Sequence, residues 1–427
     1  MKKLFSLLVA GTMMLGMVAC APKTGTDSKK PAESNKATAG KATEKKKDDK
    51  KPAAGAISLK LWGSQDDQEF LNERVKAFEA AHKDKKFDIQ VSVVGEPDAQ
   101  TKVLEDLDAA ADVFAMPNDQ VKELVKAGAL TKVSRKNDLE YITKQETGAD
   151  AFSIGKDLYA FPFAADNGYF MYYDKRVLSA DDVKDLDTML AKAAKAKKKV
   201  HMDIANGWYI ASFFVGNGGK FEVDDKGVQK VNFNDANGVA AGEAIKAFAA
   251  SPAFATGDDN AMKEGFTKGT LCAAVSGTWN AADLKKILGD GYAAAKLPTF
   301  TAAGKKVQMG SFAGYKGYGI NSHSKHKAEA MDLAMFLTSE ESQAKRFQMR
   351  GTGPANLKVQ QSEAVKKDVA LSALMAQQKF SVSQNNVLGS YWNPAGAFGK
   401  AMLDKSTESV KKLLDEMVKQ IQQPATK

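Results

Sequence analysis

The chain has 427 residues, of which 44% are hydrophobic and 26% charged; this is the composition of a globular protein with more residues than one hydrophobic core usually spans. The formal charge of +9 is concentrated near the N-terminus, because residues 21–51 hold ten lysines against five acids and the first three residues add two lysines, which leaves about +2 for the rest. A nearly neutral remainder argues against a nucleic-acid partner, which would need a basic face on the folded domain. The two cysteines, Cys20 and Cys272, imply no disulfide framework, and we interpret Cys272 as a small core residue.

The N-terminal residues have the pattern of an export signal followed by a spacer. Residues 1–20 combine a basic head, a short apolar run and small residues near its end. The last four, 17–20, resemble a bacterial lipobox, which implies cleavage before Cys20 and lipidation of that residue; the alternative is a plain signal peptide with a chance cysteine. Residues 21–55 contain no large apolar side chain, so we expect a disordered, Lys-rich tether.

The part of the chain that follows opens with an α/β pattern. Alternation of apolar and polar residues predicts strands over 57–62 and 87–93, and an amphipathic spacing predicts a helix around 71–78. Residues 112–119 predict a third strand that ends in a polar loop, and the next helix should stop near Gly128. The repeated order of strand, loop and helix favours a sheet with ligand-binding loops at its strand ends.

The segment 159–174 is apolar on both sides of a polar pair, Asp166 and Asn167. Its Tyr, Phe and Met residues favour strands, and Pro162 and Gly168 exclude one continuous helix. A charged group inside such a run is costly unless a partner satisfies it. We therefore expect the chain to cross here from one domain to another, with the polar pair at the mouth of a cleft and facing a ligand. The alternative is a buried strand whose Asp caps a turn.

The second half of the chain predicts further elements of the same kind. We expect helices over 183–193 and 410–421, strands over 200–204 and 271–275, a Gly-rich return crossing over 310–321, and a helix-capping box at 338–341. Each of these two strands leads into a polar segment that contains tryptophan.

Signatures of catalysis, metal binding and cofactor binding are missing from the sequence. It has no phosphate-cradling Gly-Lys-Ser/Thr loop, no Gly-x-Ser-x-Gly elbow and no His-Glu-x-x-His motif. Tyr172 and Tyr173 offer two phenolates for iron, but neighbours on a strand face opposite ways, so at most one can point into a cleft. We expect no cofactor and no metal, and a neutral solute rather than ferric iron as the ligand.

Aromatic residues recur beside polar clusters at the predicted strand ends. The instances are Trp62 with Gln65 and Asp66, Met116 with Asn118 and Asp119, Trp208 and Tyr209 with Asn206, Trp279 with Asn280, and Trp392 with Asn393. A sugar has an apolar C–H face and a rim of hydroxyls, so it needs flat aromatic platforms bordered by acids and amides. Core packing is the commoner role for any single tryptophan, but all four lie in such places.

Several stretches together resemble the extracellular solute-binding proteins of ABC sugar transporters, the family that includes the maltose and maltodextrin binders. The matching stretches, in order, are 61–67, 112–119 with 128–130, 161–174, 269–279, 297–300 and 391–392. The resemblance implies an α/β, two-lobed periplasmic-binding-protein-like fold with three hinge crossings and an interdomain cleft that closes on its ligand. It places the crossings near 164–167, 314–318 and 360–367, the N-lobe at 56–165 plus 317–364, and the C-lobe at 166–316 plus 365–427.

The resemblance also implies the ligand-binding residues. Three residues of the first lobe would bind sugar hydroxyls, namely Gln65, Asp66 and Asp119. Three residues of the second lobe would stack on the sugar rings, namely Tyr209, Trp279 and Trp392. The full expected set is Trp62, Gln65, Asp66, Met116, Asp119, Asp166, Asn167, Trp208, Tyr209, Trp279, Tyr315 and Trp392. The chain departs from the best-known maltose binder at Met116 and Gln120, where that protein has tryptophan and arginine, so sugar length and linkage stay open.

These observations predict a binding protein rather than an enzyme. We expect a monomer, lipid-anchored at Cys20 on the extracellular face of the cell membrane, that captures maltose or maltodextrin-type oligosaccharides by hinge closure and delivers them to an ABC permease. One alternative is a binder of another glycan or a polyol, or one that serves a sensor kinase. The other is a glycoside hydrolase with paired carboxylates such as Asp66 and Asp166.

Overall fold

The computed structural model describes residues 55–423. The predicted signal peptide, the predicted lipidation site at Cys20 and all of the predicted tether except Gly55 lie outside the described residues. Within the described part of the chain, two separate sheets each form the centre of a lobe, and no helix there is long and apolar enough to cross a membrane.

The first lobe is built on a six-stranded sheet with the order β17-β16-β3-β1-β2, in which β6 pairs with β16 off this path. Its strands are β1 (Ile57–Gly63), β2 (Phe87–Val93), β3 (Val113–Pro117), β6 (Ala160–Gly168), β16 (Ser311–Ile320) and β17 (Ser381–Ser383). Strand β1 runs parallel to β2 and β3, whereas β16 runs antiparallel to β3 and β6. The three strands predicted between residues 57 and 119 are confirmed.

Helices cover this first sheet. They are α1 (Gln68–Ala81), α2 (Ala99–Glu105), α3 (Val121–Lys126), α4 (Lys136–Gln145), α10 (Lys327–Leu337), α11 (Glu340–Arg350), α12 (Leu357–Gln360) and α13 (Glu363–Lys366). The face of α1 predicted from its spacing, with Leu71, Val75 and Phe78, is buried in the core. The chain turns after α3 at Gly128, whose φ of +70° suits glycine.

The second lobe is built on a five-stranded sheet with the order β11-β8-β12-β7-β13. Its strands are β7 (Phe170–Asp174), β8 (Lys199–His201), β11 (Phe254–Ala255), β12 (Leu271–Ser276) and β13 (Tyr292–Ala295). On β7, Tyr172 lies in one hydrophobic cluster and Tyr173 in another, as the alternation of strand side chains requires. Cys272 on β12 is fully buried, which confirms its role as a core residue.

Helices also cover the second sheet, and three two-stranded hairpins lie outside the two large sheets. The helices are α5 (Leu186–Lys195), α6 (Gly207–Gly216), α7 (Ala236–Ala250), α8 (Asp259–Thr267), α9 (Ala281–Leu288), α14 (Val369–Gln378), α15 (Trp392–Leu403) and α16 (Val410–Ile421). The hairpins are β4 (Ser153–Ile154) with β5 (Asp157–Leu158), β9 (Phe221–Val223) with β10 (Gln229–Val231), and β14 (Thr299–Ala302) with β15 (Lys305–Gln308).

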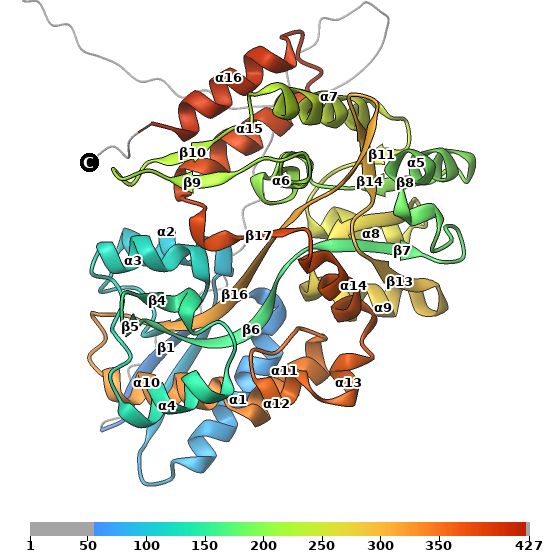
Figure 1. Cartoon of the computed structure of the whole chain (residues 1–427). Helices are drawn as coiled ribbons and strands as arrows, with labels where there is room; N and C mark the ends of the chain where they lie inside the picture. The colour runs from blue at the N-terminus through green and yellow to red at the C-terminus, as the bar shows by residue number, and fades with distance from the viewer. Residues whose placement is uncertain (1–54, 424–427) are drawn as a thin grey trace, which may run out of the picture. The chain divides into compact units, whose positions relative to one another are not determined.

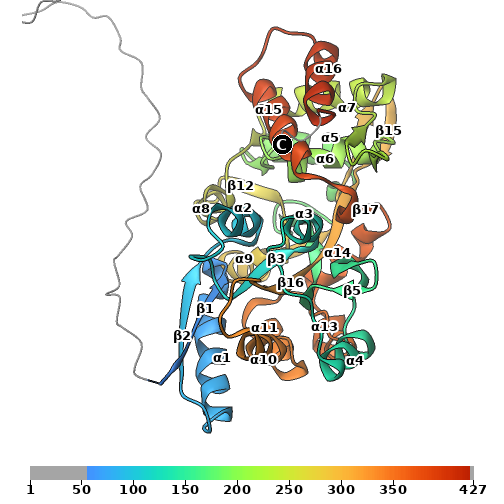
Figure 2. The same ribbon diagram turned by 90° about the vertical axis from the view of Figure 1, so that its left-hand side faces the viewer.

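Two antiparallel strands, β6 and β16, pass from one lobe to the other side by side (Figure 1). Figure 2, turned by 90°, shows α15, α16 and α7 at one end of this arrangement and α1, α10 and α11 at the other. The expected lobe boundaries at 165/166 and 316/317 both fall inside these continuous strands. Around the third expected crossing, 360–367, the chain forms the short helix α13. The lobe boundaries stay a prediction.

Two local predictions were wrong. The strand expected over 200–204 ends at His201, and Trp208 and Tyr209 lie in the first turn of α6 rather than in a loop, because the Asn206 side chain caps that helix by accepting from the Trp208 amide at 3.0 Å. The capping box expected at 338–341 is replaced by a single cap one residue later. Ser339 is the cap and accepts from the amide of Ser342, while the preceding threonine bonds back into α10.

Candidate functional site

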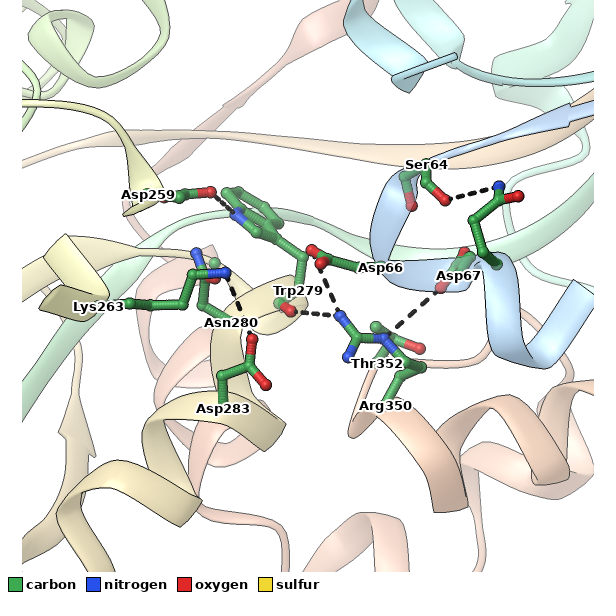
Figure 3. A network of polar contacts seen from close by, with 12 residues as sticks. Ser64, Asp66, Asp67, Asp259, Lys263, Trp279, Asn280, Asp283, Arg350 and Thr352 are labelled. Carbon is green, nitrogen blue, oxygen red and sulfur yellow. Dashed lines mark hydrogen bonds and ion pairs between the residues drawn. The ribbon is translucent and has the colours of Figure 1, made fainter. Parts of the chain in front are cut away.

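Trp279 lies where the second lobe meets the first. It follows β12 in the short 3-10 helix η6 (Thr278–Asn280), and its ring is half-buried. Its ring nitrogen Nε1 donates to Oδ2 of Asp259 at 2.9 Å, and its carbonyl oxygen accepts from Nη2 of Arg350 at 2.9 Å (Figure 3). The ammonium of Lys316, from β16, lies 5.4 Å from the centre of the ring, within cation–π distance. We call Trp279 with Asp66, Asp259, Lys316 and Arg350 the Trp279 junction.

The loop after β1 supplies the first lobe's side of the Trp279 junction. In the 3-10 helix η1 (Gln65–Asp67), Asp66 lies 3.5 Å from the Arg350 guanidinium, while Gln65 is exposed and has no contact to the junction among those the structure gives. Asp67 is buried and takes two hydrogen bonds from Arg346, at 2.7 and 3.0 Å. This paired buried acid fixes the loop. Trp62 packs half-buried against the first core.

Asp166 and Asn167 are both buried on β6, and the structure gives each of them protein partners. Oδ2 of Asp166 accepts from the Thr278 hydroxyl at 2.5 Å and from the amide of Gly353. The Asn167 amide donates to Gln384 Oε1 at 2.7 Å. Asp166 therefore ties the crossing strand to the residue before Trp279, and the cost of its burial is offset within the protein.

Asp119 is the site carboxyl with the strongest perturbation. It lies in the 3-10 helix η3 (Asn118–Gln120), and its Oδ1 is buried without a hydrogen-bond partner among residues 55–423. Burial raises the pKa of Asp119 to about 7, against a partial offset from its own backbone amide and the side chain of Gln384. A buried acceptor in this state is ready for a donor from a ligand.

The second aromatic group lies where α6 and α15 begin. The half-buried rings of Trp208 and Trp392 have centroids 6.2 Å apart, and Phe312 of β16 lies 5.1 Å from the first ring and 5.7 Å from the second. A pocket of about 420 Å³ opens beside Trp392, and it is lined in addition by Asp203, Ala205, Asn206, Gly207, Asn393, Gly396, Ala397 and Lys400. We call it the Trp392 pocket. An aromatic ring with acid, amide and ammonium groups around it is the kind of surface that hydroxylated ligands need.

Buried tyrosines connect this aromatic group to the Trp279 junction. Tyr209 is buried, 5.3 Å from Tyr169, which in turn lies 5.4 Å from the Trp208 ring. The charge of Asp259 contributes to a raised pKa of the Tyr209 phenol, for which burial is the main cause. Tyr209 thus lies beneath the aromatic surface and leaves little ring for a ligand to stack on.

Two expected ligand residues lie elsewhere. Met116 is fully buried in the first core, under Gly319. The Tyr315 ring packs against Gly148, whose φ of +84° and lack of a side chain make room for it. The structure does not bring these two side chains to the Trp279 junction or the Trp392 pocket. Sequence reasoning missed Asp203, Asp259, Lys316, Arg350 and Lys400, and only Arg350, a cation at a helix end before Gly351, carried a local signal.

Metal-ligating side chains do not gather around these groups. Within the described residues, no three or more His, Cys, Asp or Glu side chains are grouped so that they could hold a metal ion.

Known proteins match the chain along nearly its whole length. Residues 73–373, more than half of the chain, match the family described as bacterial extracellular solute-binding protein. A galactooligosaccharide-binding protein of Bacillus subtilis (strain 168) is 26% identical in an alignment 441 positions long, which covers 96% of this chain and 97% of that protein.

Solved structures match as well, and they confirm the two-lobed α/β fold. A structure of a complex with acarbose is 31% identical with a TM-score of 0.79 over 86% of this chain and 99% of that one. The maltodextrin binding protein MalE1 from L. casei BL23 is 27% identical with a TM-score of 0.72 over 86% and 100%. The maltotriose binding protein of Thermus thermophilus is 22% identical with a TM-score of 0.74 over 85% and 99%, a likeness of fold alone. The chain therefore belongs to the bacterial extracellular solute-binding proteins, a family of binding proteins and not of enzymes.

Proposed function

We propose that this protein is the substrate-binding component of an ABC transporter and captures a neutral oligosaccharide of the maltodextrin type. The observation that carries the proposal is the Trp279 junction, where Arg350 links Asp66 of the first lobe to the carbonyl of Trp279, whose half-buried ring belongs to the second lobe. Asp119 of the first lobe and Trp392 of the second are the further groups that we propose to take part.

The chemistry of these groups fits a sugar better than an ion. The rings offer flat apolar surface for the C–H faces of pyranose rings, and Asp119 Oδ1, buried with no hydrogen-bond partner in residues 55–423, offers an acceptor for a hydroxyl. The acarbose complex and the maltodextrin binder from L. casei, at 31% and 27% identity, favour α-linked glucose oligomers.

A galactooligosaccharide is the second candidate. It is favoured by the 26% identity to the Bacillus subtilis galactooligosaccharide-binding protein, which extends over 96% of this chain. The two candidates differ in the configuration at C4 of each ring, which changes the direction of a free 4-hydroxyl and, where O4 is the linkage oxygen, the path of the chain, so a site with fixed platforms and acceptors distinguishes them by shape and by which hydroxyls it reaches.

The test is a titration of the protein with maltose to maltopentaose and with galactobiose and galactotriose, followed by calorimetry and by intrinsic tryptophan fluorescence. The proposal predicts that the gluco-oligosaccharides bind more tightly than the galacto-oligosaccharides and change the fluorescence. Tighter galacto-oligosaccharide binding would assign the second candidate, and no response to either series would remove the oligosaccharide proposal.

We also propose that the mature protein is a monomer held to the outer face of the cell membrane by a lipid on Cys20, so that captured sugar stays near its permease. Lipid chains on both the thiol and the amine of Cys20 would together give stable attachment, because each buried methylene adds about 0.8 kcal/mol and one chain alone binds only marginally. Replacing Cys20→Ser should move the protein from the membrane fraction into the medium. A wild-type protein that carries no lipid mass on Cys20 when it is extracted from the membrane fraction would exclude this anchor.

A further inference from the structure

The indole ring of Trp279 is fixed at its edge as well as along its face. Gly277 lies so close under the ring that a Cβ built there would be 2.0 Å from Cζ3 of Trp279, so the ring rests directly on the backbone. The Nε1–H group at the ring edge is half-buried and needs an acceptor, because Trp nitrogen is only a donor. Asp259 Oδ2 supplies that acceptor at 2.9 Å (Figure 3).

Asp259 stands on a rigid support. It is the first residue of α8, and Met262 and Phe266 of that helix are buried in the core of the second lobe. The preceding residue, Asp258, has a different task, since its side chain caps α8 by accepting from the Ala261 amide at 2.9 Å. The two adjacent acids thus have different partners: Asp258 accepts from the helix backbone, and Asp259 accepts from the Trp279 indole.

We infer that Asp259 is a positioning residue, which sets the orientation of the Trp279 ring and through it the affinity for the sugar. The inference rests on the proposed function, because a stacking platform contributes only if its plane is held against the ligand. The carboxylate accepts the indole N–H in a charge-assisted bond, so the ring does not have to be ordered by the sugar when it binds. Asp259 need not touch the sugar for this effect.

The experiment compares the wild type with Asp259→Ala, Asp259→Asn and Asp258→Ala, each labelled with ¹⁵N at the tryptophan indoles. Four tryptophans give four indole N–H resonances, and the Trp279 resonance is identified by its loss in Trp279→Phe. We expect Asp259→Ala to shift this resonance and to weaken oligosaccharide binding about tenfold, because the sugar must then order the ring itself, with a smaller loss of Tm than the cap variant Asp258→Ala. Asp259→Asn keeps an acceptor oxygen and should restore most of both properties.

Asp258→Ala is the matched control. It should lower the Tm through the lost cap and leave the Trp279 resonance and the affinity unchanged. The inference is overturned if Asp259→Ala leaves the resonance in place, or if it lowers the Tm as much as Asp258→Ala while the affinity stays the same. Failure of the proposed function is distinguishable. The wild type would then bind no oligosaccharide, although Asp259→Ala would still shift the Trp279 resonance and so report the hydrogen bond between the two residues.

Discussion

We expect the Asp119 carboxyl, which we propose as a sugar ligand, to make affinity depend on pH. Its pKa is raised by burial from the ordinary 3.8 to about 7, so near neutrality a large fraction of the molecules carry the proton. Because a hydroxyl donor favours the charged carboxylate, sugar binding competes with protonation, and affinity should fall about tenfold between pH 8 and pH 6. Calorimetry at both pH values with the wild type and Asp119→Asn checks this, since the variant should lose the pH dependence.

The raised pKa of Asp119 also makes the free energy of unfolding depend on pH, and in the opposite direction: affinity should fall as the pH falls, whereas stability should rise. A carboxyl whose pKa is higher in the folded state than in the unfolded chain destabilises the fold where it is charged, and the penalty disappears as the pH falls below the unfolded value. Asp119→Asn should therefore be more stable than the wild type at pH 8, by about 1 kcal/mol or more, and the difference should shrink toward pH 4. Equal unfolding curves at pH 8 would show that the burial penalty is absent.

Trp392 offers a second test at the scale of one residue. Its ring is half-buried beside the Trp392 pocket, whereas Phe398 on the same helix is 3% exposed and belongs to the core. Trp392→Ala should weaken oligosaccharide binding about tenfold or more, with a smaller loss of stability than Phe398→Ala, which should cost about 3–5 kcal/mol and leave affinity nearly unchanged. Urea unfolding measures the stability of both variants, and calorimetry measures their affinity. A large loss of stability with unchanged affinity in Trp392→Ala would make Trp392 a core residue.

Single residues also show where prediction from sequence stops. The polar pair in the apolar run at 159–174 indicated that Asp166 and Asn167 need partners, and we expected a ligand in that role, whereas the structure gives both side chains protein partners. The partners Thr278, Gly353 and Gln384 lie 112, 187 and 217 residues away in the chain, so no local pattern names them. The same reason hid Asp259, whose role appears only beside a tryptophan 20 residues later.

At the scale of elements, periodicity predicted the helices α1 and α16 and the strands β1 and β2, because these elements have one face more buried than the other. The strands β3 and β12 are buried along their whole length and show no such alternation, and helix α7 was not predicted. Periodicity failed where a cap competed with the pattern, as at Asn206, which starts α6 directly after a short strand. It also could not foresee that β6 and β16 pair with each other as they pass between the lobes, because that pairing joins segments about 150 residues apart.

Gly314 tests how tightly the crossing strand β16 is packed. A Cβ at this position would lie 2.6 Å from Asn118 Oδ1 and 2.8 Å from Gln384 Oε1, and both oxygens already accept hydrogen bonds, from the amide of Tyr315 and from Asn167. Gly314→Ala must displace these amides, so we expect a loss of about 1–3 kcal/mol in the free energy of unfolding.

The control for this change is Gly95→Ala, where the added Cβ meets only ordinary contacts at 3.6 and 3.7 Å and the backbone is extended. Its unfolding free energy should stay within about 0.5 kcal/mol of the wild type. Urea titration of both variants measures these free energies of unfolding. An unchanged value for Gly314→Ala would mean that the side chains of Asn118 and Gln384 can move aside at little cost.

At the scale of the whole molecule, a polar contact links the two lobes at the Trp279 junction. Arg350 of the first lobe joins Asp66 to the carbonyl of Trp279 in the second lobe. A binding protein that closes around its ligand has an affinity that depends on the population of the closed state. Contacts of this kind should therefore affect binding even where they touch no sugar.

Arg350→Ala tests this coupling. The variant loses a partly buried guanidinium with partners in both lobes, which should shift the balance toward open molecules by about 1–2 kcal/mol and weaken oligosaccharide binding about five- to thirtyfold. Small-angle scattering should show a larger radius of gyration for the sugar-free variant than for the wild type, and a saturating sugar should restore the compact form. Lys345→Ala, on the same helix, removes only a 3.1 Å ion pair with Glu73 and should change neither quantity. An Arg350→Ala protein with wild-type scattering and affinity would show that the bridge at the Trp279 junction accompanies closure without stabilising it.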